Sequence, residues 1–322
     1  MDKRYLILLI ILVNSTLYGQ QIPEWSSFYD IGFIWNPALT AQHDYWEISA
    51  TNRKEWLGFS QAPQYSNLAF QIPLRNKDYD LKSGVGFYLD SDRVGPYTKL
   101  NLGVSYSYEI HLGFTSTDAL SIGLSGQLQQ QRLSTNEFVA FDDLSNELNP
   151  GDINSTYFPD ISFGLNYISK NEYLNFEDNY FYVGISANRL IPNNNMVNIF
   201  GKLSSNLHGT FSGGFRNYLK KNKNIYLEPN ILISYSRTNH INVMLNVRVE
   251  DQRYFWVSGG LVSNHEIFGQ IGVILNEDSF LEKILNDGIL RIGIKVDYKL
   301  SKFSSIGGLG SEIYLAYRYR FE

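Results

Sequence analysis

The most regular feature of this chain is an alternation of apolar and polar residues that recurs from about Tyr45 to the C-terminus. In residues 100–112 the even positions are apolar or aromatic, whereas the odd positions are Asn, Gly, Ser, Glu and His. Residues 241–249, 290–300 and 313–321 alternate in the same way, and in all four segments every charged residue lies on one side. A period of two predicts β-strands with one apolar and one polar face.

Segment length favours one of the two architectures that produce such strands, a soluble β-sandwich or a transmembrane barrel. Many of the alternating segments are 10–13 residues long, about twice the usual soluble strand of about 5–6 residues. A tilted membrane strand needs about 9–11 residues. We therefore predict an all-β, antiparallel transmembrane β-barrel, with a large soluble β domain as the alternative.

The alternating segments number about fourteen. An even number places both ends of the barrel on the periplasmic side, so the two long connections at 134–158 and 190–205 would lie outside the cell. The predicted strands are residues 45–55, 64–74, 82–92, 97–112, 118–133, 159–169, 179–189, 206–218, 223–237, 239–250, 253–263, 266–276, 289–300 and 310–321.

The two faces predict different surroundings. The polar face would line a lumen of mixed charge, formed by Glu109, Arg216, Arg248, Glu250, Arg291, Lys295, Asp297, Arg318 and Arg320. Aromatic residues near strand ends would form interfacial girdles; they are Tyr180, Phe181, Tyr298, Tyr317, Tyr319 and Phe321. Residues 277–288 predict a short periplasmic amphipathic helix, which rests on the rim or docks a partner.

The N-terminus predicts export. Lys3 and Arg4 precede an apolar run too short to cross a bilayer, so residues 1–19 are predicted to be a signal peptide. Residues 20–44 include the large side chains of Trp25, Phe28, Tyr29, Phe33, Ile34 and Trp35, and Asn36-Pro37 would end any helix there. Because fourteen strands enclose more space than their side chains fill, we expect 20–44 to be a plug or periplasmic segment before the barrel at 45–322.

Composition narrows the chemistry. The formal net charge of -5 gives no clustered basic face for nucleic acid, and the absence of cysteine excludes disulfides and thiolate metal sites. The five histidines are scattered, with no zinc motif, nucleophile elbow or complete phosphate loop. The sequence therefore predicts no enzyme, no cofactor and no metal site.

The order of several motifs resembles the PorP/SprF family of outer-membrane proteins of the Bacteroidetes type IX secretion system. Each motif alone is weak, but together they extend over nearly the whole mature chain. They are Asn36-Pro37-Ala38, Arg53 with Trp56 and Pro63, Gly84-Val85-Gly86, Tyr106-Ser107-Tyr108, Phe163-Gly164-Leu165-Asn166-Tyr167, Tyr182-Val183-Gly184 and Gly310-Ser311-Glu312.

This resemblance implies a non-enzymatic outer-membrane component that supports secretion or surface attachment of large adhesins with C-terminal sorting domains, often in gliding bacteria. Its implied partners are the adhesin, outer-membrane lipid, and periplasmic and translocon components. Asn36, Pro37, Arg53, Trp56 and Pro63 are candidates for plug docking or partner contact, although folding of the first hairpin would also explain them. The competing function is a plugged channel for small or lipophilic solutes, as in fatty-acid transporters.

Overall fold

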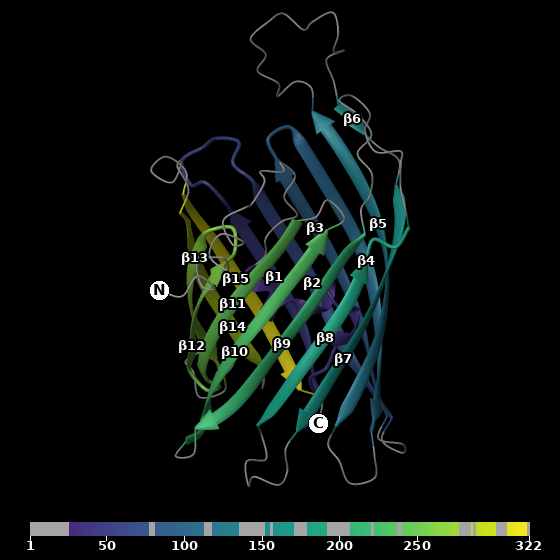
Figure 1. Cartoon of the computed structure of the whole chain (residues 1–322), viewed down its shortest axis with the longest axis vertical. Coiled ribbons are helices and arrows are strands. Elements are labelled where there is room, and N and C mark those ends of the chain that lie inside the picture. Colours follow the sequence, from purple (N-terminus) through teal and green to yellow (C-terminus); the bar gives the residue numbers. More distant parts are fainter. Residues whose placement is uncertain are drawn as a thin grey trace, which may run out of the picture.

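The computed structural model of this chain is a closed β-barrel (Figure 1). It describes residues 26–76, 81–112, 118–134, 152–154, 157–170, 179–191, 207–219, 222–236, 240–276, 285, 288–300 and 308–320. The predicted signal peptide, residues 1–19, lies outside this range. In the described part, no helix is long and apolar enough to cross a membrane.

The barrel wall consists of fourteen antiparallel strands, each paired with its neighbours in chain order, and closes where β15 pairs with β1. The strands are β1 Tyr45–Lys54, β2 Gln64–Asn76, β3 Leu81–Val94, β4 Tyr97–His111, β5 Ala119–Ser134, β7 Phe158–Lys170, β8 Tyr180–Asn188, β9 His208–Leu219, β10 Asn222–Ser236, β11 His240–Asp251, β12 Phe255–Val262, β13 Glu266–Leu275, β14 Ile289–Lys299 and β15 Leu309–Arg320. Closure gives every one of these strands two hydrogen-bonding neighbours, as a lipid environment requires.

All fourteen predicted segments correspond to these strands, with ends that differ by two residues or fewer. The sequence did not predict β6 Asp152–Asn154, which pairs only with the last residues of β5. Within the predicted helix at 277–288, Leu285 is helical and buried, and Gly288 is also described, whereas the remaining residues lie outside the described range.

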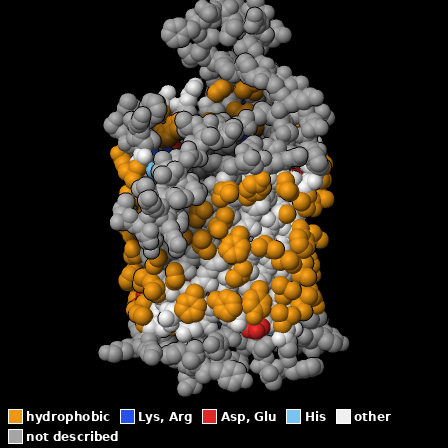
Figure 2. Space-filling view, viewed as in Figure 1, with side chains coloured by type: hydrophobic (Ala, Val, Ile, Leu, Met, Phe, Trp, Pro, Cys, Tyr) orange, Lys and Arg blue, Asp and Glu red, His pale blue; other side chains and the backbone are white. Residues whose placement is uncertain are grey.

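The outer face is apolar and the inner face polar, as the alternation predicts. Exposed apolar side chains cover the wall (Figure 2); Ile271, for example, is 63% exposed and Leu124 is 55% exposed. Among the predicted lumenal charges, Arg248, Glu250, Arg291, Lys295 and Asp297 are all buried. A belt of apolar side chains around a polar interior is the arrangement of a barrel in a membrane.

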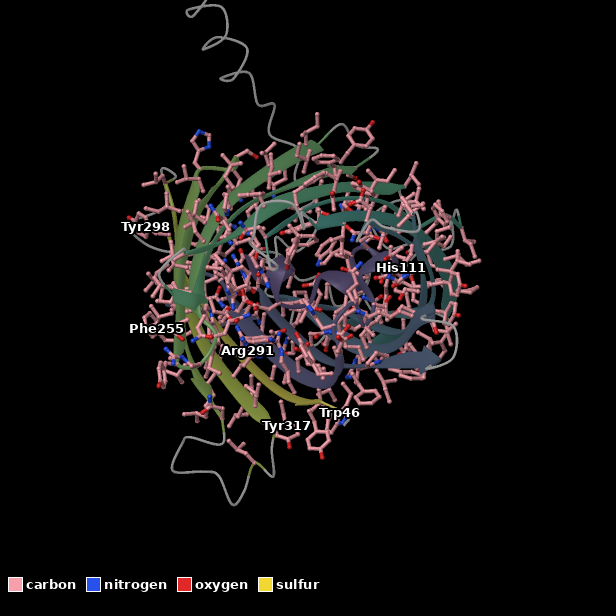
Figure 3. All side chains as sticks on the ribbon, turned by 90° about the horizontal axis from the view of Figure 1, so that it is seen from below. Trp46, His111, Phe255, Arg291, Tyr298 and Tyr317 are labelled. Carbon is pink, nitrogen blue, oxygen red and sulfur yellow. The ribbon has the colours of Figure 1, made fainter. Side chains whose placement is uncertain are left out.

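An aromatic girdle lies at the end of the barrel that holds the start of β1 and the end of β15. The Trp46 ring centroid is 5.5 Å from that of Tyr317 and 5.8 Å from that of Tyr319. Figure 3 places Trp46 and Tyr317 on the outside of the ring. The prediction for Tyr180 was wrong, because this ring packs against the lumenal guanidinium of Arg216; Tyr180 lies on the inner face of β8, opposite to Phe181.

The directions of the strands determine which connections lie at the same end of the barrel. The strand ends that flank 134–158 and 190–205 lie opposite to the end that holds Tyr45 and Arg320. The short link between β9 and β10 lies at the same end as Tyr45 and Arg320. In Figure 1 the C-terminal end is at the bottom and β6 is at the top.

Candidate functional site: the N-terminal segment inside the barrel

The described residues before β1, 26–44, lie within the ring of strands and are called the lumenal segment below (Figure 3). They form three short 3₁₀ helices, η1 Ser26–Tyr29, η2 Gly32–Ile34 and η3 Pro37–Leu39. Asn36 caps η3, because its side-chain oxygen accepts a hydrogen bond of 3.0 Å from the backbone N–H of Ala38. Pro37 follows at the first helical position, where its missing N–H costs no bond.

Three inward-facing glycines on β5, β7 and β8 make room for Asn36 and Pro37; we call them the first glycine site. A Cβ atom on Gly164 would lie 1.9 Å from the side-chain oxygen of Asn36, and one on Gly123 would lie 2.2 Å from the Pro37 carbonyl carbon. A Cβ on Gly184 would lie 2.8 Å from the Asn36 amide nitrogen. These positions therefore require glycine so that the segment can approach the wall.

Asn36 also bonds the wall directly. Its side-chain amide donates a hydrogen bond of 3.1 Å to the backbone carbonyl of Leu165 on β7. The carbonyl of Trp35 accepts bonds of 2.7 Å from Ser186 and 2.9 Å from Asn188, both on β8. Two consecutive residues of the segment are thus tied to two adjacent strands.

A second glycine site on β3 receives the end of the segment. A Cβ on Gly84 would lie 2.6 Å from the carbonyl oxygen of Thr40, and one on Gly86 would lie 2.8 Å from the ring of Phe33. The Thr40 hydroxyl donates to Ser105 at 3.0 Å, and the Thr40 carbonyl accepts a bond of 2.7 Å from Ser107. The segment therefore contacts β3 and β4 as well as β5, β7 and β8.

Charged groups hold the first part of the segment. Arg248 donates to the Asp30 carboxylate at 3.0 Å and to Glu250 at 2.9 Å, and both side chains of the Arg248–Asp30 pair are 1% exposed. Arg291 donates two bonds of 2.8 Å to the same Glu250. Because each buried charge has a partner of opposite sign, the network offsets part of the free-energy cost of removing these ions from water.

Tyr29 joins a second charged group. Its hydroxyl donates to Glu228 at 2.7 Å and accepts a bond of 2.7 Å from Arg216, which itself donates to Glu228 at 2.6 Å. Burial raises the pKa of Tyr29 well above its ordinary value of 10.0, so the phenol stays protonated and remains a donor at physiological pH.

Apolar side chains of the segment fill the space between these polar contacts. Phe28, Ile31 and Phe33 are each less than 7% exposed. Ile31 packs in a cluster with Trp256 and Tyr314, whereas Phe33 packs against Tyr88. Full burial of such a side chain is worth about 1.5–3 kcal/mol, so apolar contacts also hold the segment in the lumen.

Arg53, a residue predicted from the sequence, lies in a different group at the far end of β1. Its guanidinium is surrounded by carboxylates, 3.4 Å from Glu55, Glu266 and Asp297 and 3.8 Å from Glu312. Lys299 adds a second cation, 2.9 Å from Glu55. These groups come from β1, β13, β14 and β15 and the β1–β2 connection, so they link the strands beside the closure of the barrel.

Trp56 and Pro63 lie in the connection between β1 and β2. Trp56 has a positive φ of 50°, which is strained for a bulky residue, and is 42% exposed. The turn is held by bonds of 2.9 Å from the Leu57 N–H to the Leu309 carbonyl and from the Glu55 N–H to the Pro63 carbonyl. The five predicted residues therefore divide into Asn36 and Pro37 in the lumen, Arg53 in the wall network and these two at the rim.

Sequence reasoning missed the residues that position the segment. Gly84, Gly164 and Gly184 appear in motifs that resemble the family, but their contacts with the segment are long-range and leave no local signal. Tyr29 was noted only as one of the large side chains of the segment, and Asp30 was not singled out. Among the described residues, no group of three or more His, Cys, Asp or Glu side chains is arranged to hold a metal ion.

Comparison with known families decides the assignment. Residues 17–317 match the family described as "Type IX secretion system membrane protein PorP/SprF". The chain belongs to the PorP/SprF family. The comparison with curated proteins gives no match. Family and fold are those of secretion-related membrane barrels, and together they support an outer-membrane location for this PorP/SprF protein.

Solved structures share the fold at low identity. The toluene transporter TodX of Pseudomonas putida superimposes with a TM-score of 0.55 and 8% identity over 91% of this chain and 94% of that chain. A Pseudomonas aeruginosa FadL homologue gives 0.52 and 10% over 89% and 93%, and the CymD monoaromatic hydrocarbon channel gives 0.51 and 10% over 90% and 92%. At these identities the likeness concerns the fold alone.

Proposed function

We propose that this protein is a non-enzymatic outer-membrane component of a type IX secretion system that supports the secretion or surface attachment of large adhesins with C-terminal sorting domains. The observation that carries the proposal is the family match over residues 17–317. Further partners in the proposal are outer-membrane lipid and the periplasmic and translocon components, in a gliding-type bacterium of the Bacteroidetes. Residues 1–19 would direct export as a signal peptide.

The contacts of the lumenal segment support a barrel interior that stays closed during secretion. We infer that residues 20–44 act as a plug, because contacts of the described part reach β3, β4, β5, β7, β8, β9, β10 and β11. In this mechanism the exported protein does not pass through the barrel. It is instead recognised at the outer loops, 134–158 and 190–205, or at the rim near Trp56 and Pro63.

A secretion assay tests the proposal. Deletion of the gene should abolish the appearance of sorting-domain adhesins at the cell surface, and the intact gene should restore it. The purified complex from native membranes should contain secretion components and the adhesin. If every sorting-domain substrate still reached the surface in the deletion strain, the proposed function would be wrong.

The second candidate is a plugged channel for small or lipophilic solutes. The observation in its favour is the fold shared with the toluene transporter TodX and the FadL homologue. Proteoliposomes distinguish the two functions: a transporter takes up a labelled monoaromatic hydrocarbon or fatty acid faster than empty liposomes do, whereas the secretion component does not.

A further inference from the structure

A group of polar side chains interrupts the apolar outer face on β1, β2 and β3. Asn52, Lys54, Gln64, Ser66 and Ser91 occupy outward-facing positions and are called the polar patch below. They are contiguous, because Asn52 pairs with Ser66, Ser66 with Ser91, and Lys54 with Gln64. The Asn52 amide donates a hydrogen bond of 2.8 Å to the Ser66 hydroxyl on this exposed surface.

The patch contrasts with the surfaces beside and below it. Two residues nearer the end that holds Tyr45, the corresponding row is Ala50, Leu68 and Leu89, all apolar. On β4 the outward positions from Leu100 to Ile110 are apolar or aromatic throughout. The polar patch therefore interrupts the apolar wall at the level of Asn52 and Ser66. At the level of Lys54 and Gln64, polar residues continue outward-facing through Arg93 on β3, Thr98 on β4 and Arg132 on β5.

Its depth places part of the patch within the hydrocarbon. Asn52 lies six residues along β1 from Trp46, which marks the aromatic girdle. At about 3.3 Å per residue and a tilt of about 40°, Asn52 is roughly 15 Å above the girdle. The apolar belt of such barrels is about 25 Å tall. Asn52 and Ser66 are thus below the lipid headgroups, where acyl chains offer no hydrogen-bond partner.

The charge of the polar patch and its depth in the membrane indicate which kind of molecule binds it. A lipid headgroup would reach Lys54, nearer the rim, but not Asn52 and Ser66. A second copy of this chain, docked on the same patch, would bring Lys54 against Lys54 and Arg93 in a medium that screens charge weakly. We infer that the polar patch is a lateral docking surface for a different membrane-embedded protein that presents carboxylate or amide groups at this depth. Trp56 and Phe59 are also exposed, in the connection that joins Lys54 of β1 to Gln64 of β2.

Photo-crosslinking from within the membrane tests the inference independently of secretion. A benzophenone amino acid replaces Gln64 in one variant of the full-length protein and Val243 in the control. Val243 faces outward on β11, five strands away from β1 around the ring. Position 64 should give a product with a membrane-embedded protein, mapped to a carboxylate- or amide-bearing site in its own membrane-spanning region, and position 243 should not.

Two further variants make the result decisive. Lys54→Glu should abolish the product, and a Lys at the mapped partner carboxylate should restore it. The double variant Asn52→Leu/Lys54→Leu, with the benzophenone amino acid still at position 64, should still fold as a heat-modifiable barrel, because apolar side chains suit the outer face, yet lose the crosslinked product. Products only with lipid, only with a second copy of the chain, or equally from position 243 would overturn the inference.

Discussion

Gly164 is the glycine at which an added Cβ would come nearest to the lumenal segment, 1.9 Å from the Asn36 side-chain oxygen. In Gly164→Val the new side chain would overlap Asn36, so the segment should lose its contact with β7 at a cost of about 1–3 kcal/mol. The chain contains no cysteine, so an Ala38→Cys reporter is the sole thiol. Its labelling rate should rise in Gly164→Val.

The matched control is Gly126→Val, on the outward face of β5, where an added Cβ has no atom within 4 Å. This variant should label at the rate of the parent protein. Equal labelling rates for both variants would show that the first glycine site does not hold the segment.

Arg248 is the cation on which the Asp30 contact depends. Arg248→Met should lower the free energy of unfolding in detergent by about 3–5 kcal/mol, because Asp30 stays buried without its partner. Adding Asp30→Asn should recover part of this loss. Arg253→Met should change stability by less than about 1 kcal/mol, since the Arg253 side chain is 43% exposed. Strictly additive effects of Arg248→Met and Asp30→Asn would argue against the direct pair.

For single residues, the sequence predicted on which face of its strand each charged side chain lies, but it did not predict the residue that pairs with it. The period of two placed Arg248, Glu250 and Arg291 inside, since neighbours on a strand alternate between faces. The bond from Arg248 to Asp30 joins residues 218 positions apart, and no local pattern encodes such a contact. Tyr180 was misassigned because an aromatic residue near a strand end suits a girdle and a lumen equally well.

The lumenal segment is the element whose removal is most informative. A variant in which residues 1–19 are joined directly to β1, without residues 20–44, should still form a barrel, because the ring of fourteen strands closes through its own backbone pairing. In planar bilayers it should show larger and more frequent conductance steps than the full-length protein. Identical conductance for the two proteins would contradict the proposed plug.

The strands were predictable as elements because each alternates over more residues than chance allows and is bounded by turn residues. β6 was not predictable, since three residues cannot establish a period. The position of the segment was predicted only from its excess hydrophobicity. The 3₁₀ helix η3 follows from Asn36 and Pro37, but the glycine sites that accept the segment form only when four strands are brought together.

The stability of the barrel as a whole depends on the apolar belt around its wall. Leu245, 49% exposed on β11, lies near the middle of the belt, so Leu245→Arg should reduce stability in lipid vesicles by about 2–4 kcal/mol. Leu309, at the start of β15, lies close to the rim, and Leu309→Arg should cost about 0–1 kcal/mol. Equal costs at the two depths, measured by urea titration, would be inconsistent with a membrane-spanning orientation.

The pairing of β1 with β15 has a consequence for biogenesis. β15 follows the other thirteen wall strands in the chain and supplies the edge that seals the cylinder, so sealing cannot precede translocation of all fourteen strands. Residues 26–44 contact the wall opposite this seam as well as the strands beside it, and they precede β1 in the chain. We therefore expect them to be enclosed as the sheet curls, so that their native contacts form during assembly of the barrel.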